Sequence, residues 1–269
     1  RLNSSAASDV YKRQESKFAP VRKPTEILGV LLPEIAAATG LPLRTQVTVG
    51  IHDSNASLYP HILTQQEPFS VVSTGTWVIA MSVGGGYQNL APDRDTLINV
   101  NAHGEPFNSA RFMGGREYEV ILKGQASLVT KEDISTALSQ QIMLLPAVDP
   151  TTGPYQGYDM HWLGDEPEVG TGLRTAVLSL YLAMMTDSCL QLSGAGGPTI
   201  IEGPFARNAE FLTMLSIATG RAVLQSKSTT GTSVGAALLF GSSDALERPE
   251  PCDFGAFSKS WDAYAARWR

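Results

Sequence analysis

The chain has few cysteines and no long apolar run, and each shortage excludes a class of protein. Its two cysteines, Cys189 and Cys252, are too few for the disulfide framework of a small secreted domain. A reducing compartment is therefore expected. No apolar run approaches the roughly 20 residues that a membrane-spanning helix needs, and no segment resembles a secretory signal. These features predict a cytoplasmic protein that does not bind membranes.

The chain also lacks an excess of positive charge and several well-known motifs. Its formal net charge is −6 over 269 residues, which argues against a surface for nucleic acid. There is no P-loop of the G-x-x-x-x-G-K-[ST] type, no G-x-S-x-G and no zinc-like His/Cys spacing, so no protein-held metal is predicted. The hydrophobic share of 43% is that of an ordinary globular protein with room for a large core.

The most informative stretch is residues 47–57. An apolar run at residues 47–51 is typical of a buried strand, and His52 and Asp53 follow it directly. Asp53 stands where the N-cap of a helix belongs, so its carboxylate is expected at the mouth of a sheet, where ligands commonly bind. Taken alone, such an aspartate is more often only a helix cap.

A hydroxyl-rich turn is the second candidate element. Two strand-like runs, residues 69–73 and 77–82, are predicted to form an antiparallel hairpin through the turn Ser73-Thr74-Gly75-Thr76. Backbone N–H groups and hydroxyls in a turn of this kind suit an anion. Taken alone, the turn is more often only a hairpin connection.

The third candidate element is the loop Gly203-Pro204-Phe205-Ala206-Arg207-Asn208, between a strand at residues 199–202 and a helix at residues 209–219. A glycine lets the backbone approach a ligand closely, and a helix N-terminus favours an anion. The plainer interpretation is a strand-to-helix turn capped by Asn208.

Together, and in this order, the three elements resemble the FGGY family of carbohydrate kinases, within the actin-like, ribonuclease-H-like ATPase superfamily. The resemblance covers about residues 46–241. It implies an α/β fold: a ribonuclease-H-like domain with a mixed sheet flanked by helices, preceded by the tail of a first such domain. It further implies ATP and Mg²⁺ as cofactors, and a sugar hydroxyl as the group that is phosphorylated.

The same resemblance implies a role for each element. Asp53 would be the catalytic base, and the sugar would contact His52, Asp53 and Ser54. The ATP phosphates would lie at Ser73, Thr74, Gly75 and Thr76, and the adenosine at Gly203, Pro204, Arg207 and Asn208. The pairing of His52 with Asp53 is closest to the rhamnulokinase and fuculokinase branch, so a ketose such as L-rhamnulose or L-fuculose is expected. Glu202-Gly203-Pro204 departs from the glycine run that is commoner in the family.

The expected domain organisation is that of a fragment. Residues 1–14 are polar and unpatterned and are interpreted as a non-native leader. Residues 15–66 would be the tail of the N-terminal kinase domain, residues 67–245 the C-terminal nucleotide-binding domain, and residues 246–269 a tail with a helix. The family's D-x-G-T-x-x-x-R phosphate loop does not precede Asp53, so the chain is expected to be inactive alone.

Further helices are predicted from apolar periodicity. One spans about residues 24–40, with Pro33 as a kink and an apolar face that its missing neighbours leave poorly covered. Others are predicted at residues 56–63, 117–123, 131–141, 174–191, 232–240 and 261–268. Residues 146–170 are predicted to be a long ordered loop over the face of the domain.

Two rival functions stay open. A kinase-dead protein that senses a sugar or nucleotide would keep the fold without turnover. An actin-like assembly protein would bind ATP but would need no sugar base, and Asp53 beside His52 argues against it. A homodimer is left open.

Overall fold

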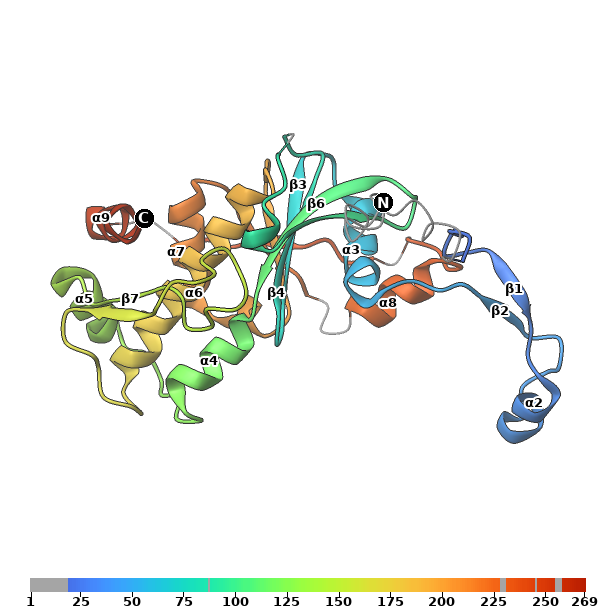
Figure 1. The fold of residues 1–269 in the computed structure, drawn as a ribbon, viewed down its shortest axis with the longest axis horizontal. Helices are drawn as coiled ribbons and strands as arrows, with labels where there is room; N and C mark the ends of the chain where they lie inside the picture. The colour runs from blue at the N-terminus through green and yellow to red at the C-terminus, as the bar shows by residue number, and fades with distance from the viewer. Residues whose placement is uncertain (1–18, 87, 228–230, 245, 255–257) are drawn as a thin grey trace. The chain divides into compact units, whose positions relative to one another are not determined.

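The computed structural model describes residues 19–86, 88–227, 231–244, 246–254 and 258–269 (Figure 1). The interpreted leader at residues 1–14 lies outside the described residues. The chain divides into two compact units. The first draws on the segments Arg1–Thr64, Asn99–Pro106 and Thr230–Leu246, and the second on Gln65–Ile98, Phe107–Thr229 and Glu247–Arg269.

A seven-stranded mixed sheet organises the second unit. Its strand order is β11-β10-β9-β3-β4-β6-β5, with β10, β9 and β3 parallel and β3, β4 and β6 antiparallel. The predicted hairpin is confirmed, because Thr74 pairs with Val78 at the turn. The strands are β3 (Phe69–Thr74), β4 (Val78–Val83), β5 (Thr96–Val100), β6 (Pro106–Phe112), β9 (Thr199–Glu202), β10 (Val223–Gln225) and β11 (Glu250–Pro251).

Helix α6 (Gly172–Leu192) is the core of this unit, and it packs against β4, α5 (Lys131–Gln140) and α7 (Ala209–Thr219) (Figure 1). By length and composition α6 would suffice to cross a membrane, which corrects the expectation that no segment reaches that size. Most of it is buried among the protein's own side chains, as in the core helix of a globular domain. Its N-cap is Thr171, whose hydroxyl accepts the Arg174 N–H.

The second unit also contains shorter helices and strands outside the seven-stranded sheet. The 3₁₀ turn η2 spans Pro92–Arg94, and α4 spans Gly114–Leu122. Strand β8 (His161–Leu163) lies within the predicted long loop and pairs with β7 (Met143–Leu145), which precedes that loop. Helix α9 (Lys259–Trp268) packs against the core, and its Trp268 indole donates a hydrogen bond to the Leu144 carbonyl at 2.8 Å.

Residues 24–40 of the first unit do not form one helix. They form strand β1 (Ile27–Val30), which pairs with β2 (Gln46–Thr48), and then helix α2 (Pro33–Thr39). The β-branched residues of β1 favour an extended chain. Pro33 starts a helix instead of kinking one, because a first-turn residue needs no N–H partner.

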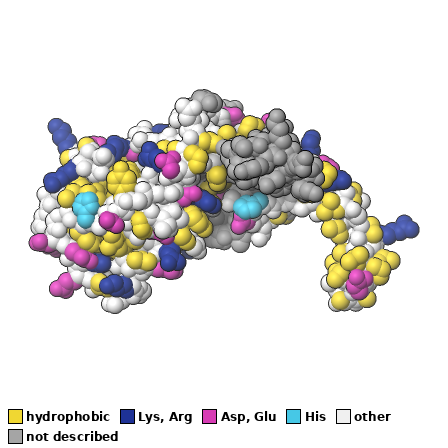
Figure 2. Space-filling view, viewed as in Figure 1, with side chains coloured by type: hydrophobic (Ala, Val, Ile, Leu, Met, Phe, Trp, Pro, Cys, Tyr) yellow, Lys and Arg dark blue, Asp and Glu magenta, His cyan; other side chains and the backbone are white. Residues whose placement is uncertain are grey.

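The strand predicted to be buried is short and exposed. Val47 and Val49 are each 38% exposed, since among the described strands β2 pairs with β1 alone, in a two-stranded ladder. Ile27, Leu28 and Val30 are also more than half exposed, and Figure 2 shows the hydrophobic side chains of this segment in yellow. The expected exposed apolar surface in residues 24–40 is therefore confirmed, although much of it belongs to strand β1 and not to a helix.

Two helices pack tightly within the first unit. Helix α3 (Asp53–Thr64) lies against α8 (Gly231–Leu238), and Gly235 faces the Ala56 carbonyl so closely that a Cβ there would overlap it. Glycine at this position therefore lets α3 and α8 approach each other closely. Pro60 is accommodated inside α3.

Candidate functional site

A cavity of about 700 Å³ in the second unit collects residues from segments that are far apart in the sequence. Its lining comes from the turn after β3, the start of α4, the segment ahead of α5, and the loop after β9. The chief lining residues are Gly75, Thr76, Gly115, Tyr118, Leu128, Phe205, Arg207 and Asn208. The structure thus brings the predicted phosphate turn and the predicted adenosine loop to one cavity.

The turn presents its backbone to this cavity. Gly75 and Thr76 are exposed, and the Gly75 N–H donates to the Trp77 carbonyl at 2.9 Å. Arg111 lies over the Trp77 ring, 4.5 Å from its centroid. The turn is therefore held by a backbone hydrogen bond, while Gly75 and Thr76 remain exposed at the cavity.

The hydroxyl of Thr74 is not free in the same way. Thr74 is 5% exposed, and its Oγ1 donates to the Glu202 carbonyl and accepts the Phe205 N–H. Ser73, half-buried, pairs with Glu202 in the parallel ladder. Of the four residues predicted at the phosphates, only Gly75 and Thr76 line the cavity.

The loop after β9 forms a 3₁₀ turn, η3 (Pro204–Arg207), which leads into α7. Asn208 is the N-cap of α7, because its Oδ1 accepts the Phe211 N–H at 2.8 Å. Its amide nitrogen donates to the Ser179 hydroxyl of α6, also at 2.8 Å. Asn208 therefore fixes the loop to the core, as well as lining the cavity.

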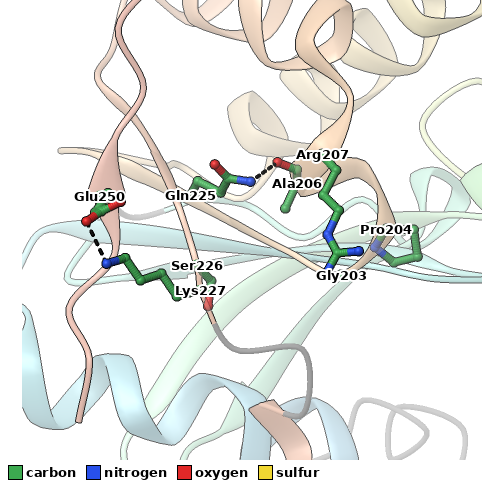
Figure 3. A pocket seen from close by; sticks show the side chains of 8 residues that line it. All are labelled: Gly203, Pro204, Ala206, Arg207, Gln225, Ser226, Lys227 and Glu250. Atoms are coloured by element: carbon green, nitrogen blue, oxygen red, sulfur yellow. Dashed lines mark hydrogen bonds and ion pairs between the residues drawn. The ribbon is translucent and has the colours of Figure 1, made fainter. Parts of the chain in front are cut away.

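Arg207 stands between two cavities. The second cavity, of about 470 Å³, is lined by Gly203, Arg207, Lys227 and their neighbours (Figure 3). Lys227 is ion-paired with Glu250 at 2.6 Å, whereas the Arg207 guanidinium makes no hydrogen bond or ion pair with any described residue. Arg207 thus places a positive charge at the boundary of the larger cavity, and Arg116 of α4, 4.0 Å from the Asp149 carboxylate, places a second one there.

Helix α4 supplies cavity residues that the sequence analysis missed. The N–H of Gly115 donates to the Thr76 carbonyl at 3.2 Å, and Tyr118 and Glu119 follow on the same helix. The signal was the pair Gly114-Gly115, one residue after the end of β6, which permits close approach at a helix start. Leu128, 90% exposed, gives the cavity an apolar rim that no motif marks.

One carboxyl on α4, outside the lining of this cavity, has a strongly perturbed pKa. Glu117 of α4 is fully buried, and burial raises the pKa of its carboxyl to about 7. Its Oε1 accepts the Asp149 N–H at 3.2 Å, while Oε2 has no hydrogen-bond partner among the described residues. The neighbouring Asp149 carboxylate adds to the rise.

The predicted base belongs to the first unit. Asp53 is the first residue of α3, and its Oδ1 lies 2.9 Å from His52 Nδ1 and 2.7 Å from the Ser54 backbone nitrogen. The His52 and Asp53 side chains are 72% and 73% exposed. The carboxylate is thus presented outward, and it holds the N–H of the next residue rather than acting as an ordinary N-cap.

The lining of the larger cavity suits a ligand that has an anionic part and a flat apolar part. The exposed turn and Arg207 suit negative charge, and Tyr118, Leu128 and Phe205 suit a flat apolar group. The mixed sheet flanked by helices, with a ligand cavity at the end of parallel strands, defines an α/β domain of the ribonuclease-H-like, actin-like ATPase class.

Sequence comparison then identifies the family. The profile of the C-terminal domain of FGGY carbohydrate kinases matches residues 66–249, so the chain belongs to the FGGY carbohydrate kinase family. No curated protein sequence matches the chain.

Solved structures agree with this assignment. A carbohydrate kinase from Novosphingobium aromaticivorans is similar with a TM-score of 0.76 and 33% identity, over 94% of this chain and 57% of that one. A ligand-bound xylulose kinase from Lactobacillus acidophilus shares the fold, with a TM-score of 0.70 and 10% identity, over 97% and 58% of the two chains. So does a glycerol kinase from Plasmodium falciparum with ADP, with a TM-score of 0.60 and 16% identity, over 86% and 50%. The chain therefore spans little more than half the length of these kinases.

Proposed function

We propose that this chain forms the nucleotide-binding part of an enzyme that transfers the γ-phosphoryl group of ATP to a sugar hydroxyl. One observation carries the proposal: the exposed turn at Gly75 and Thr76 and the loop ending at Asn208 line the same cavity. Because the chain belongs to the FGGY family, we assign ATP to that cavity. The phosphates would lie at the turn, and the adenosine between α4 and η3.

In this proposal Asp53 is the general base. It accepts the proton of the sugar hydroxyl while the hydroxyl oxygen attacks the γ-phosphorus and the bond to ADP breaks. General-base help of this kind is typically worth about 10²–10⁴-fold. The support for this role is that the carboxylate is 73% exposed and lies 2.9 Å from His52 Nδ1.

The sugar proposed is a ketose of the L-rhamnulose or L-fuculose kind. The support is His52 beside Asp53: together they present an imidazole and a carboxylate to a polyhydroxylated substrate. Ser54 adds a hydroxyl at the same helix start. A strong preference for glycerol or D-xylulose would contradict this part of the proposal.

Mg²⁺ is proposed as a partner of the ATP phosphates. Among the described residues, no group of three or more His, Cys, Asp or Glu side chains is placed to hold a metal ion. Mg²⁺ retains several water ligands and is commonly held by substrate phosphates. Its proposed role is to neutralise phosphate charge, with the protein contributing contacts through water.

We further propose that catalysis needs a domain beyond these residues. The family's first domain carries a phosphate loop, and positioning by opposed domains supplies about 7–11 kcal/mol of barrier reduction in favourable cases. The matched kinase from Novosphingobium aromaticivorans is longer, since this chain covers 57% of it. A kinase-dead sensor with the same fold is the remaining alternative, and turnover by a polypeptide containing both domains would exclude it.

Calorimetric titration of the chain with ATP and Mg²⁺ tests the proposal. Binding is expected, and Gly115→Ala should weaken it at least tenfold, because a Cβ at Gly115 would overlap the Gly75 carbonyl. Gly29→Ala is the matched control, since Gly29 has open space around it. A wild-type chain that does not bind ATP would contradict the proposed site.

A further inference from the structure

Thr74 links the two segments that line the cavity, the turn after β3 and the loop after β9. It is the last residue of β3, and Glu202 is the last residue of the neighbouring parallel strand β9. The Thr74 hydroxyl donates to the Glu202 carbonyl at 2.5 Å and accepts the Phe205 N–H at 3.1 Å. One hydroxyl thus satisfies a buried acceptor and a buried donor that lie on either side of Gly203.

The chain between those two partners passes directly over Thr74. Gly203 has a φ of +81°, and a Cβ there would overlap the Thr74 carbonyl oxygen. A side chain at this position would be strained by its backbone conformation and blocked by its neighbour. The start of η3 is therefore fixed to the end of β3 by a hydrogen-bonded and close-packed junction.

The other side of the turn is fixed in a similar manner. Gly115 of α4 donates its N–H to the Thr76 carbonyl, and its Cα lies against the Gly75 carbonyl with no room for a Cβ. Gly75 and Thr76 are consequently held between α4 and the Thr74 junction. Their backbone geometry depends on both contacts.

We infer that Thr74 is a positioning residue that couples the phosphate turn to the adenosine loop, and that it does not itself bind phosphate. The inference rests on the proposed function and deepens it. Thr74 is 5% exposed and its hydroxyl hydrogen is already donated to a protein carbonyl, so a phosphate oxygen would have to displace the Glu202 contact. Gly75 and Thr76, which are exposed, remain the groups that meet phosphate.

The inference makes a different prediction from direct phosphate binding. Loss of a direct contact would weaken ATP and ADP but leave adenosine unaffected. Loss of the junction lets both the turn and η3 shift, so the affinities for ATP, ADP and adenosine should all fall.

The test is calorimetric titration of the chain with ATP, ADP and adenosine. Thr74→Val keeps the side-chain shape and removes the hydroxyl, and it should lower all three affinities at least tenfold. Thr74→Ser restores the hydroxyl and should bind within threefold of wild type. Thr199→Val is the matched control, because Thr199 is a buried residue of β9 whose hydroxyl has no partner among the described residues. It should bind like wild type.

Amide hydrogen exchange at Phe205 gives a readout that does not depend on nucleotide. Exchange at this N–H should speed up in Thr74→Val and stay slow in Thr74→Ser and Thr199→Val. If Thr74→Val does not fold, Gly203→Ala disturbs the same junction from the loop side and should show the same pattern of lost affinities.

Two results would overturn the inference. One is a Thr74→Val protein that loses ATP and ADP binding but keeps adenosine binding, which would make Thr74 a direct ligand. The other is a Thr74→Val protein that binds all three normally. A wild-type chain that binds no nucleotide would instead overturn the proposed function, and Phe205 exchange would then still decide whether the hydroxyl holds the loop.

Discussion

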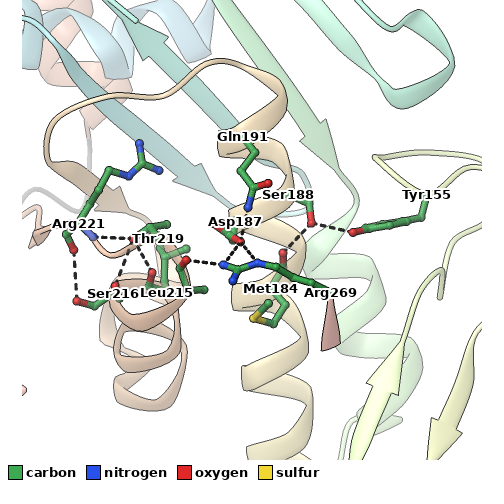
Figure 4. A network of polar contacts seen from close by, with 11 residues as sticks. Tyr155, Met184, Asp187, Ser188, Gln191, Leu215, Ser216, Thr219, Arg221 and Arg269 are labelled. Atoms are coloured by element: carbon green, nitrogen blue, oxygen red, sulfur yellow. Dashed lines mark hydrogen bonds and ion pairs between the residues drawn. The ribbon is translucent and has the colours of Figure 1, made fainter. Parts of the chain in front are cut away.

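The guanidinium of Arg269 forms an ion pair with the buried carboxylate of Asp187, with 2.9 Å between Nη2 and Oδ2 (Figure 4). Asp187 belongs to the core helix α6, and its side chain is 3% exposed. Gln191, one turn further along α6, donates to the same oxygen at 2.7 Å. Arg269 also donates to the Ala218 carbonyl at the end of α7, so one side chain ties the C-terminal segment to two core helices.

Removing this ion pair should destabilise the second unit. Arg269→Ala leaves the Asp187 carboxylate buried with Gln191 as its remaining hydrogen-bond partner among the described residues, and breaking a buried pair from one side costs about 3–5 kcal/mol. Because Arg269 is 42% exposed, we expect about 2 kcal/mol, measured as the free energy of unfolding in urea. Arg267→Ala, in the last turn of α9 just before Arg269, is the control and should change stability by less than about 0.5 kcal/mol. Equal stabilities of the two variants would show that the pair contributes nothing.

Glu117 should make stability depend on pH. Its folded-state pKa is raised from 4.5 to about 7, so the folded protein keeps the proton in a range where the unfolded chain has lost it. Stability is therefore highest below about pH 4.5 and falls as pH rises toward 7, by about 3 kcal/mol in all at 1.36 kcal/mol per pKa unit. Above pH 7 this contribution stays constant.

The variant Glu117→Gln should remove that dependence, because an amide does not titrate and can still accept the Asp149 N–H. Unfolding free energies of wild type and variant, measured between pH 5 and pH 8, should diverge as pH rises, with the variant becoming the more stable. Glu119→Gln, on an exposed position of the same helix, is the control. A pH profile of Glu117→Gln that parallels wild type would contradict the assignment.

Asp53→Asn should abolish most turnover without affecting nucleotide binding. The measurement needs a polypeptide that also supplies the N-terminal domain of the family. There kcat should fall by about 10²–10⁴-fold, since the amide cannot accept the proton, while the dissociation constant for ATP stays unchanged. Asp262→Asn, at the start of α9, controls for the loss of a surface charge. Near-normal kcat in Asp53→Asn would remove Asp53 from the role of base.

The 269-residue chain by itself should produce no sugar phosphate. Incubation with ATP, Mg²⁺ and a panel including L-rhamnulose, L-fuculose, D-xylulose and glycerol is expected to show no turnover above a no-protein control, because one domain cannot hold sugar and γ-phosphate in line. With the N-terminal domain supplied, the first two sugars should be preferred. Robust turnover by the chain alone would show that these residues already contain every catalytic part.

Several features followed from sequence because their signals are local. The hairpin of β3 and β4 and helix α6 carry their apolar pattern within a few turns of chain. Asn208 caps α7 as predicted, since a cap bonds an N–H three residues away. The order of these elements was enough to predict the fold class and the family.

Other features depended on partners that sequence does not display. Residues 24–40 read as one helix because their apolar spacing suits a helix, yet β1 forms by pairing with β2. Gly115 lines the cavity because α4 packs against the turn at Gly75, a contact that the sequence does not show.

The sequence by itself determined which residue types stand at the ends of the strands, and hence the kind of chemistry open to this protein. The tertiary structure alone decided which partners each of them contacts. Thr74 reads as a phosphate ligand in sequence, but its hydroxyl bonds to Glu202, 128 positions away. A hydroxyl binds whichever donor and acceptor the fold brings within about 3 Å, and only the packing of β3 beside β9 determines which those are.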